Sequence, residues 1–181
     1  MTRSAIAVLL LLAATTVPAV AEEMEEIDGW RVSTRPQQAA APASPLCVLA
    51  SPIEGEQARF WLSNKIDERG GTVGDAVLQL VLDADNSLTA GESEAEINIA
   101  GQKSWNATGQ ISARDTGGVV VTFNLPSRID ETVRHIRRGA ELAFDFGQDG
   151  ELSGEYKVSL KGSGRAGQAF VDCLAKVVPA I

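Results

Sequence analysis

Residues that commonly carry catalysis or bind metal ions are scarce in this chain of 181 residues. It has 1 histidine and 2 cysteines, too few to supply the Cys and His ligands of a tetrahedral zinc site. It also contains no G-x-S-x-G or H-E-x-x-H motif, no Walker loop and no dinucleotide-binding fingerprint. These absences make an enzyme less expected, and we expect neither a cofactor nor a metal ion.

Positive charge is also in short supply. The chain has 16 Lys and Arg residues against 24 Asp and Glu residues, which gives a formal net charge of −8. A protein that binds nucleic acid needs a basic surface, so we expect no nucleic-acid partner. Hydrophobic residues make up 44% and charged residues 22%, which is typical of a globular domain.

The one long apolar run lies at the N-terminus. Arg3 precedes the apolar segment Ala5–Leu12, and Ala19–Ala21 fits the small-x-small site of signal peptidase. The run is too short to span a bilayer as a helix, which disfavours a retained signal anchor. We therefore expect a Sec signal peptide over residues 1–21, cleaved after Ala21. The protein would then be periplasmic or secreted, with no stable membrane insertion after cleavage.

Residues 22–45 have little to bury. Glu22–Glu26 is expected to form an acidic tail, and a short strand is expected around Trp30. Pro36–Pro45 contains proline, alanine, glutamine and serine but no large apolar side chain, which is typical of a linker.

Residues 46–181 have the pattern of a mainly β domain. Short segments alternate between apolar and polar residues and are separated by Gly-, Asp- and Asn-rich turns. The strongest is Ala76–Asp83, in which Leu78, Leu80 and Leu82 lie on one face. This pattern predicts an antiparallel β-sandwich of about seven to nine strands.

Two helices are expected within that domain. Ile129, Val133 and Ile136 recur at helical spacing and predict a short internal helix. A longer apolar stripe after Ser163 predicts a C-terminal helix packed on the sheet, and Cys173 lies on this stripe.

Cys47 and Cys173 are expected to form one disulfide, because an even pair of cysteines in an exported protein is most simply oxidised. The alternative is a redox-active pair, which the absence of C-x-x-C spacing disfavours. The bond would hold the C-terminal helix against the strand that carries Cys47.

A basic cluster stands out against the acidic background: Arg128, Arg134, Arg137 and Arg138. These residues form a candidate patch for an anionic partner. They could instead be a solvated helix face whose last turn complements the helix dipole. His135 lies among them, and we expect a surface histidine because the sequence places no nucleophile beside it.

The tryptophans offer a second candidate site. Trp30, Trp61 and Trp105 could form a ligand platform, although buried packing is the more common role of such residues. The sequence assigns no catalytic residue.

The order of the expected elements resembles that of a known protein family. Gly29-Trp30-Arg31-Val32 leads to the strand with Cys47, and the strand–turn Tyr156–Ser163 leads to a helix with Ala169 and Cys173. This resembles the invasion-associated locus B family of small proteobacterial periplasmic proteins. The chain also looks like other small exported proteins with the same ending, including periplasmic accessory proteins of type VI secretion. The resemblance implies a non-enzymatic β protein of the envelope, linked in pathogens to host-cell entry.

We therefore expect a non-catalytic, exported envelope accessory or binding protein. It would present a sheet face or loops to an envelope protein, a host protein or a glycan. The first alternative is an inhibitor or immunity-type protein that acts on a periplasmic hydrolase, for which a rigid surface is an advantage. The second is a hydrolase whose catalytic acids the sequence does not single out.

Overall fold

The computed structural model describes residues 23–36, 45–52, 58–66, 72–84, 88–126, 128–147 and 154–177. The expected signal peptide, and all of the expected linker except Pro36 and Pro45, lie outside these residues. The elements, in chain order, are β1 (Glu23–Ile27), β2 (Trp30–Pro36), β3 (Pro45–Ala50), β4 (Ala58–Ile66), β5 (Thr72–Leu82), β6 (Gly91–Ile99), β7 (Lys103–Ala113), β8 (Val119–Leu125), α1 (Ile129–Ile136), β9 (Glu141–Phe146), β10 (Gly154–Ser159) and α2 (Ser163–Val177).

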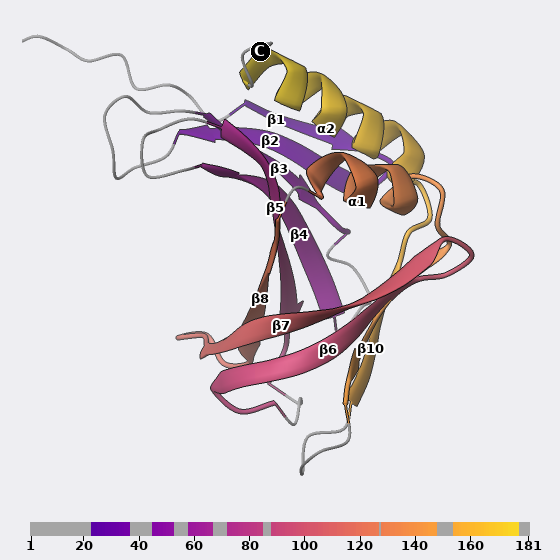
Figure 1. Cartoon of the computed structure of the whole chain (residues 1–181). Coiled ribbons are helices and arrows are strands. Elements are labelled where there is room, and N and C mark those ends of the chain that lie inside the picture. Colours follow the sequence, from indigo (N-terminus) through magenta and orange to yellow (C-terminus); the bar gives the residue numbers. More distant parts are fainter. Residues whose placement is uncertain are drawn as a thin grey trace, which may run out of the picture.

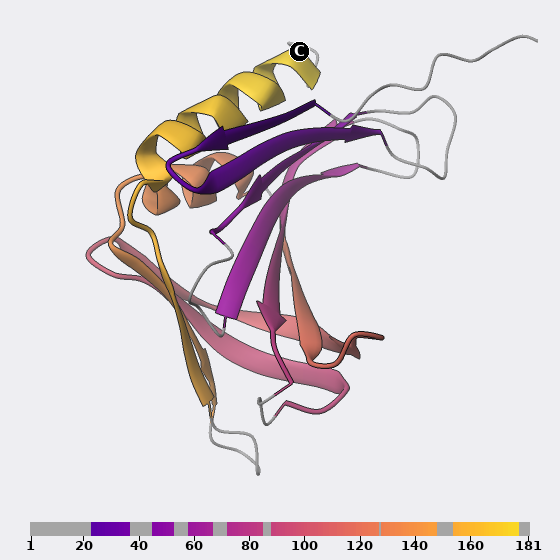
Figure 2. The same cartoon turned by 180° about the vertical axis from the view of Figure 1, so that it is seen from behind.

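The strands form one antiparallel sheet. Within the described residues it has 10 strands in the order β1-β2-β3-β4-β5-β8-β7-β6-β9-β10. The sheet curls into a half-barrel, and both helices lie at one end of it (Figures 1 and 2). The curl brings β10 into contact with β4, although the two strands do not pair.

The mainly β, antiparallel architecture with two helices is confirmed, but the expected sandwich is not. A sandwich needs two separate sheets. Here β8 pairs with both β5 and β7 and therefore joins strands β1 to β5 on one side to strands β7, β6, β9 and β10 on the other, in one continuous sheet. From β3 onward the described residues form eight strands, within the seven to nine expected for residues 46–181, and β2 is the strand expected around Trp30. The added strand is β1, which lies where an acidic tail was expected.

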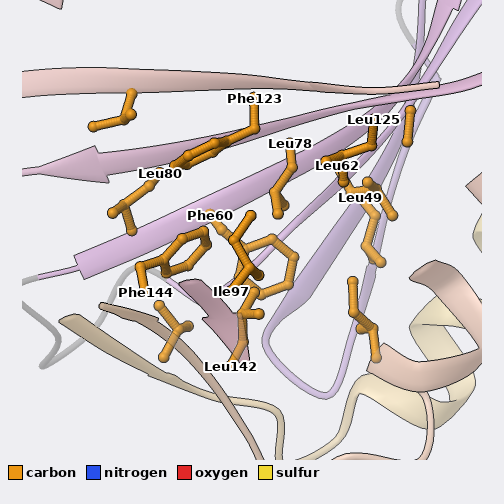
Figure 3. Packing of buried hydrophobic residues seen from close by; sticks show 14 of the residues in the cluster. Leu49, Phe60, Leu62, Leu78, Leu80, Ile97, Phe123, Leu125, Leu142 and Phe144 are labelled. Atoms are coloured by element: carbon orange, nitrogen blue, oxygen red, sulfur yellow. The ribbon is translucent and has the colours of Figure 1, made fainter. Parts of the chain in front are cut away.

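The core fills the inside of the curl. Phe60 of β4 and Leu80 of β5 lie on one side of the core. They face Ile97 of β6 and Phe144 of β9 on the other side (Figure 3). All four side chains are fully buried. This packing explains the alternation in the sequence, because every second residue of each strand must face the inside.

The helices close one end of this core. α1 buries Ile129, Val133 and Ile136, and α2 buries Phe170 while contacting β2 and β3. The hydroxyl of Ser163 donates a hydrogen bond of 2.8 Å to the carbonyl oxygen of Ile136, which links the start of α2 to the end of α1.

Gly109 of β7 packs closely against side chains of β8, and this contact yields a first prediction. A Cβ at this position would lie 2.6 Å from both the Phe123 ring and the Val121 side chain. Gly109→Ala is therefore expected to lower the free energy of unfolding by about 1–3 kcal/mol, the cost of overpacking a core. Urea unfolding followed by circular dichroism measures it.

Gly147→Ala is the matched control, because nothing lies within 4 Å of a Cβ built there. Its free energy of unfolding should change by less than about 0.5 kcal/mol. Equal unfolding midpoints for the two variants would contradict the packing seen around Gly109.

Candidate functional site

The outer face of the curled sheet carries carboxylates in register. Glu96 of β6 pairs with Asp145 of β9, and Asp145 pairs with Glu155 of β10. All three side chains are exposed. Cross-strand partners share a face and have Cβ atoms about 5 Å apart, so these carboxylates stand side by side. We call Glu96, Asp145 and Glu155 the acidic row.

The buried face fixes the position of the acidic row. Ile97 pairs with Phe144, and Phe144 pairs with Tyr156. These inward side chains alternate with the acidic row along their strands. A slip of one residue would carry Ile97 and Phe144 to the solvent, so burial of the apolar face determines where the carboxylates stand.

Positive charge near the acidic row is limited. Lys157 is the only basic residue of β6, β9 and β10. Its ammonium lies 3.0 Å from a Glu155 carboxylate oxygen and 3.9 Å from one of Glu141. The hydrogen bond that Lys157 donates to Glu155 raises the pKa of Lys157 above its usual value. Among the residues that the structure describes, neither Glu96 nor Asp145 takes part in an ion pair.

The acidic row is spread along the surface and does not converge on a point. The described part of the chain contains no group of three or more His, Cys, Asp or Glu side chains placed to hold a metal ion. The carboxylates follow the cross-strand direction, so they match an extended cationic surface better than a single ion.

The predicted arginine patch lies on and around α1. Arg128 precedes the helix, 3.9 Å from Glu131, while Arg134, Arg137 and Arg138 are exposed. The structure is compatible with both an anionic partner and a solvated helix face, so the patch stays a prediction.

His135 belongs to a small polar cluster between α1 and β7. Its Nε2 lies 3.7 Å from Glu131, and its Nδ1 lies 3.4 Å from the side-chain oxygen of Gln102. Lys103 donates a hydrogen bond to Glu131, and this is the main reason that the pKa of Glu131 lies below its usual value. The side chains pack closely against Trp105 and leave essentially no cavity for a substrate.

The tryptophans do not form a common platform. Trp30 is fully buried against Phe60, with ring centroids 5.5 Å apart. Trp105 shares the inner face with its partner Ile97, whereas Trp61 borders a hollow on the opposite face.

Cys47 and Cys173 form a disulfide, as expected, with Cα atoms 6.1 Å apart. Both residues are buried where α2 packs on β3. Neither described helix has the length and apolar character that a membrane-spanning helix needs.

Comparison with known proteins gives a likeness of fold. No family model matches the chain, and no curated protein matches it. Among solved structures, the chain is similar to invasion-associated protein B from Bartonella henselae. The TM-score is 0.52 and the sequence identity 13%, and the match covers 83% of this chain and 97% of that one. This match supports the resemblance inferred from the order of elements at the level of the fold. It does not show a function.

Proposed function

We propose that the protein is a non-catalytic, exported accessory protein of the cell envelope that binds a basic protein partner through the outer face of its sheet. The acidic row carries the proposal. Three in-register carboxylates occupy this face, with Lys157 as the only basic residue of their strands.

Like charges placed directly opposite each other across strands destabilise a sheet. Neutral polar residues at Glu96 and Asp145 would satisfy the fold equally well, since both side chains are exposed. A partner with complementary charge removes the repulsion on binding and gains in association rate and specificity.

Two further features support an exported protein. The expected signal peptide precedes the fold, and the disulfide fits an oxidising compartment. A solved structure with a similar fold is described as an invasion-associated protein, which is in keeping with a role at the cell surface.

A protein partner fits better than a glycan. Sugar-binding surfaces commonly use exposed aromatic rings, whereas Trp30 is fully buried and Trp61 and Trp105 lie on opposite faces. The inhibitor alternative uses the same acidic row against a basic hydrolase. Nanomolar inhibition of a lysozyme or an amidase would identify that role.

Neutralising the acidic row tests the proposal. To find the partner, a photoreactive residue replaces Thr108, which is exposed and pairs with Glu94 on the same outer face as the acidic row. The proteins that it crosslinks in intact cells are then identified. Glu96→Gln, Asp145→Asn and Glu155→Gln, combined, are expected to weaken binding of the partner about tenfold. The free energy of unfolding should change little, because the repulsion that is removed between neighbouring carboxylates offsets the loss of the exposed ion pair between Glu155 and Lys157.

The control removes the same charge elsewhere, through Asp115→Asn, Asp130→Asn and Asp172→Asn, all exposed positions. It should bind the partner as the unmodified protein does. Equal crosslinking in both triple variants, or binding that does not weaken as salt increases, would refute a role for the acidic row.

A further inference from the structure

β1 leaves one of its edges open. It pairs with β2 at one end of the strand order, and no other described strand lies on its far side. In Figures 1 and 2, β1 lies along α2 at the edge of the sheet. An unpaired edge presents main-chain N–H and C=O groups that an extended segment of another chain can bind.

The β1–β2 hairpin is held in place by its turn. Asp28 and Gly29 have φ values of 53° and 81°, as a type I′ turn requires. The carboxylate of Asp28 accepts hydrogen bonds from Arg165 of α2. The edge is therefore ordered before any partner arrives, which lowers the entropy cost of binding.

The hairpin also determines which groups of β1 are free. Residues that flank a two-residue turn exchange both hydrogen bonds, and bonded and non-bonded pairs alternate from there. Ile27 and Trp30 flank this turn, so Ile27 and Glu25 bind β2. The main-chain groups of Met24 and Glu26 consequently point to the open edge.

A groove lies beside β1 on the α2 face of the sheet. Its volume is about 380 Å³, and residues of β1, β2 and α2 line it. Glu23 and Glu25 face this groove, because they pair with Thr34 and Val32, which also line it. Among the described residues that line the groove, Lys176 is the one basic residue, so the groove favours a cationic side chain.

The opposite face has a smaller hollow of about 90 Å³. Met24 borders it together with Trp61 and Arg31. Met24 is 63% exposed, so its apolar side chain is available to a partner. Met, Trp and Arg are enriched at protein interfaces, and this hollow favours an apolar side chain.

These observations define the occupant. Successive side chains of a strand point to opposite faces, so a strand added beside β1 would direct alternate residues to the groove and to the hollow. We propose that β1 binds, as an added strand, an extended segment of a protein partner in which basic and apolar residues alternate.

A second copy of this chain fits the edge poorly. Pairing β1 with β1 would bring the carboxylates of Glu23, Glu25 and Glu26 close to those of the other copy, which is unfavourable. The proposal is independent of the acidic row, which reaches β10 at the other end of the strand order.

Peptide binding tests the proposal on the exported, disulfide-bonded protein. The probe is a short synthetic peptide in which lysine alternates with valine, and calorimetry measures its affinity. Glu26→Pro removes the outward N–H and leaves the pairing with β2 intact, since proline is tolerated on the free side of an edge strand. It is expected to weaken binding about tenfold. Glu26→Gln keeps the main-chain N–H and should reduce the affinity for the peptide clearly less than Glu26→Pro does.

A second arm leaves the protein unchanged. The same peptide methylated on alternate amide nitrogens cannot form the strand hydrogen bonds and should bind about tenfold more weakly. A peptide in which glutamate replaces lysine should not bind measurably. Equal binding of the methylated peptide, equal binding of the glutamate peptide, or no binding of the lysine peptide would each overturn the proposal. A dimer in solution that Glu26→Pro abolishes would overturn the assigned occupant.

Discussion

Removal of the Cys47–Cys173 disulfide is expected to lower the free energy of unfolding by about 3–5 kcal/mol. The bond joins residues separated by 126 positions, so it restricts nearly the whole domain in the unfolded state, where long loops give the largest entropic effect. The loss is comparable with the total stability of many domains, about 5–15 kcal/mol. Urea unfolding of the Cys47→Ala, Cys173→Ala variant, compared with the oxidised protein, measures it.

Reduction supplies the control for this prediction. A reducing agent should shift the unfolding midpoint of the unmodified protein toward that of the double variant and should leave the variant unchanged. Thr34→Val tests the local environment, because the Thr34 hydroxyl lies 3.4 Å from the Cys173 sulfur. It should have a much smaller effect than loss of the bond. A midpoint of the unmodified protein that does not respond to reduction would refute a stabilising role.

The elements that the sequence predicts correctly are those whose pattern is local. Leu78 and Leu80 alternate with partly exposed residues because β5 faces the core on one side. Ile129 and Val133 recur at helical spacing because α1 buries one face. In both cases the burial pattern repeats over a few residues, so the local sequence is enough to predict the element.

The curl of the sheet cannot be predicted from a local sequence pattern. It depends on the pairing of β8 with β5 and of β6 with β9. These partners are distant in sequence, and either a sandwich or a half-barrel satisfies the same alternation. β1 was missed for a related reason, since Glu23–Ile27 has no apolar alternation and becomes a strand through its pairing with β2.

The candidate sites show the same division. Arg128, Arg134, Arg137 and Arg138 were visible because they are close in sequence. The acidic row was not, because Glu96 and Asp145 become neighbours only through the register of β6 and β9. The alternating glutamates of β6 were the available signal, but nothing local indicates which acids of other strands stand beside them.

Trp30→Ala is expected to be the most destabilising single substitution in the hairpin, lowering the free energy of unfolding by about 3–5 kcal/mol. Trp30 is 0% exposed and packs edge-on against Phe60. Its indole N–H donates a hydrogen bond of 2.9 Å to the carbonyl oxygen of Lys161, 131 residues away. The side chain therefore links β2 to the turn between β10 and α2. Thermal and urea unfolding, followed by circular dichroism, measure the loss.

Trp30→Phe separates packing from the hydrogen bond. Phenylalanine keeps much of the apolar contact with Phe60 but cannot donate to Lys161, so we expect an intermediate loss of about 1–3 kcal/mol. Trp61→Phe is the matched control, because Trp61 is only partly buried and lies on the outer face; its effect should be below about 1 kcal/mol. If Trp30→Ala were no more destabilising than Trp61→Ala, the hairpin would not depend on this contact. The open edge that β1 offers to a partner would then lack the rigid support on which its binding role rests.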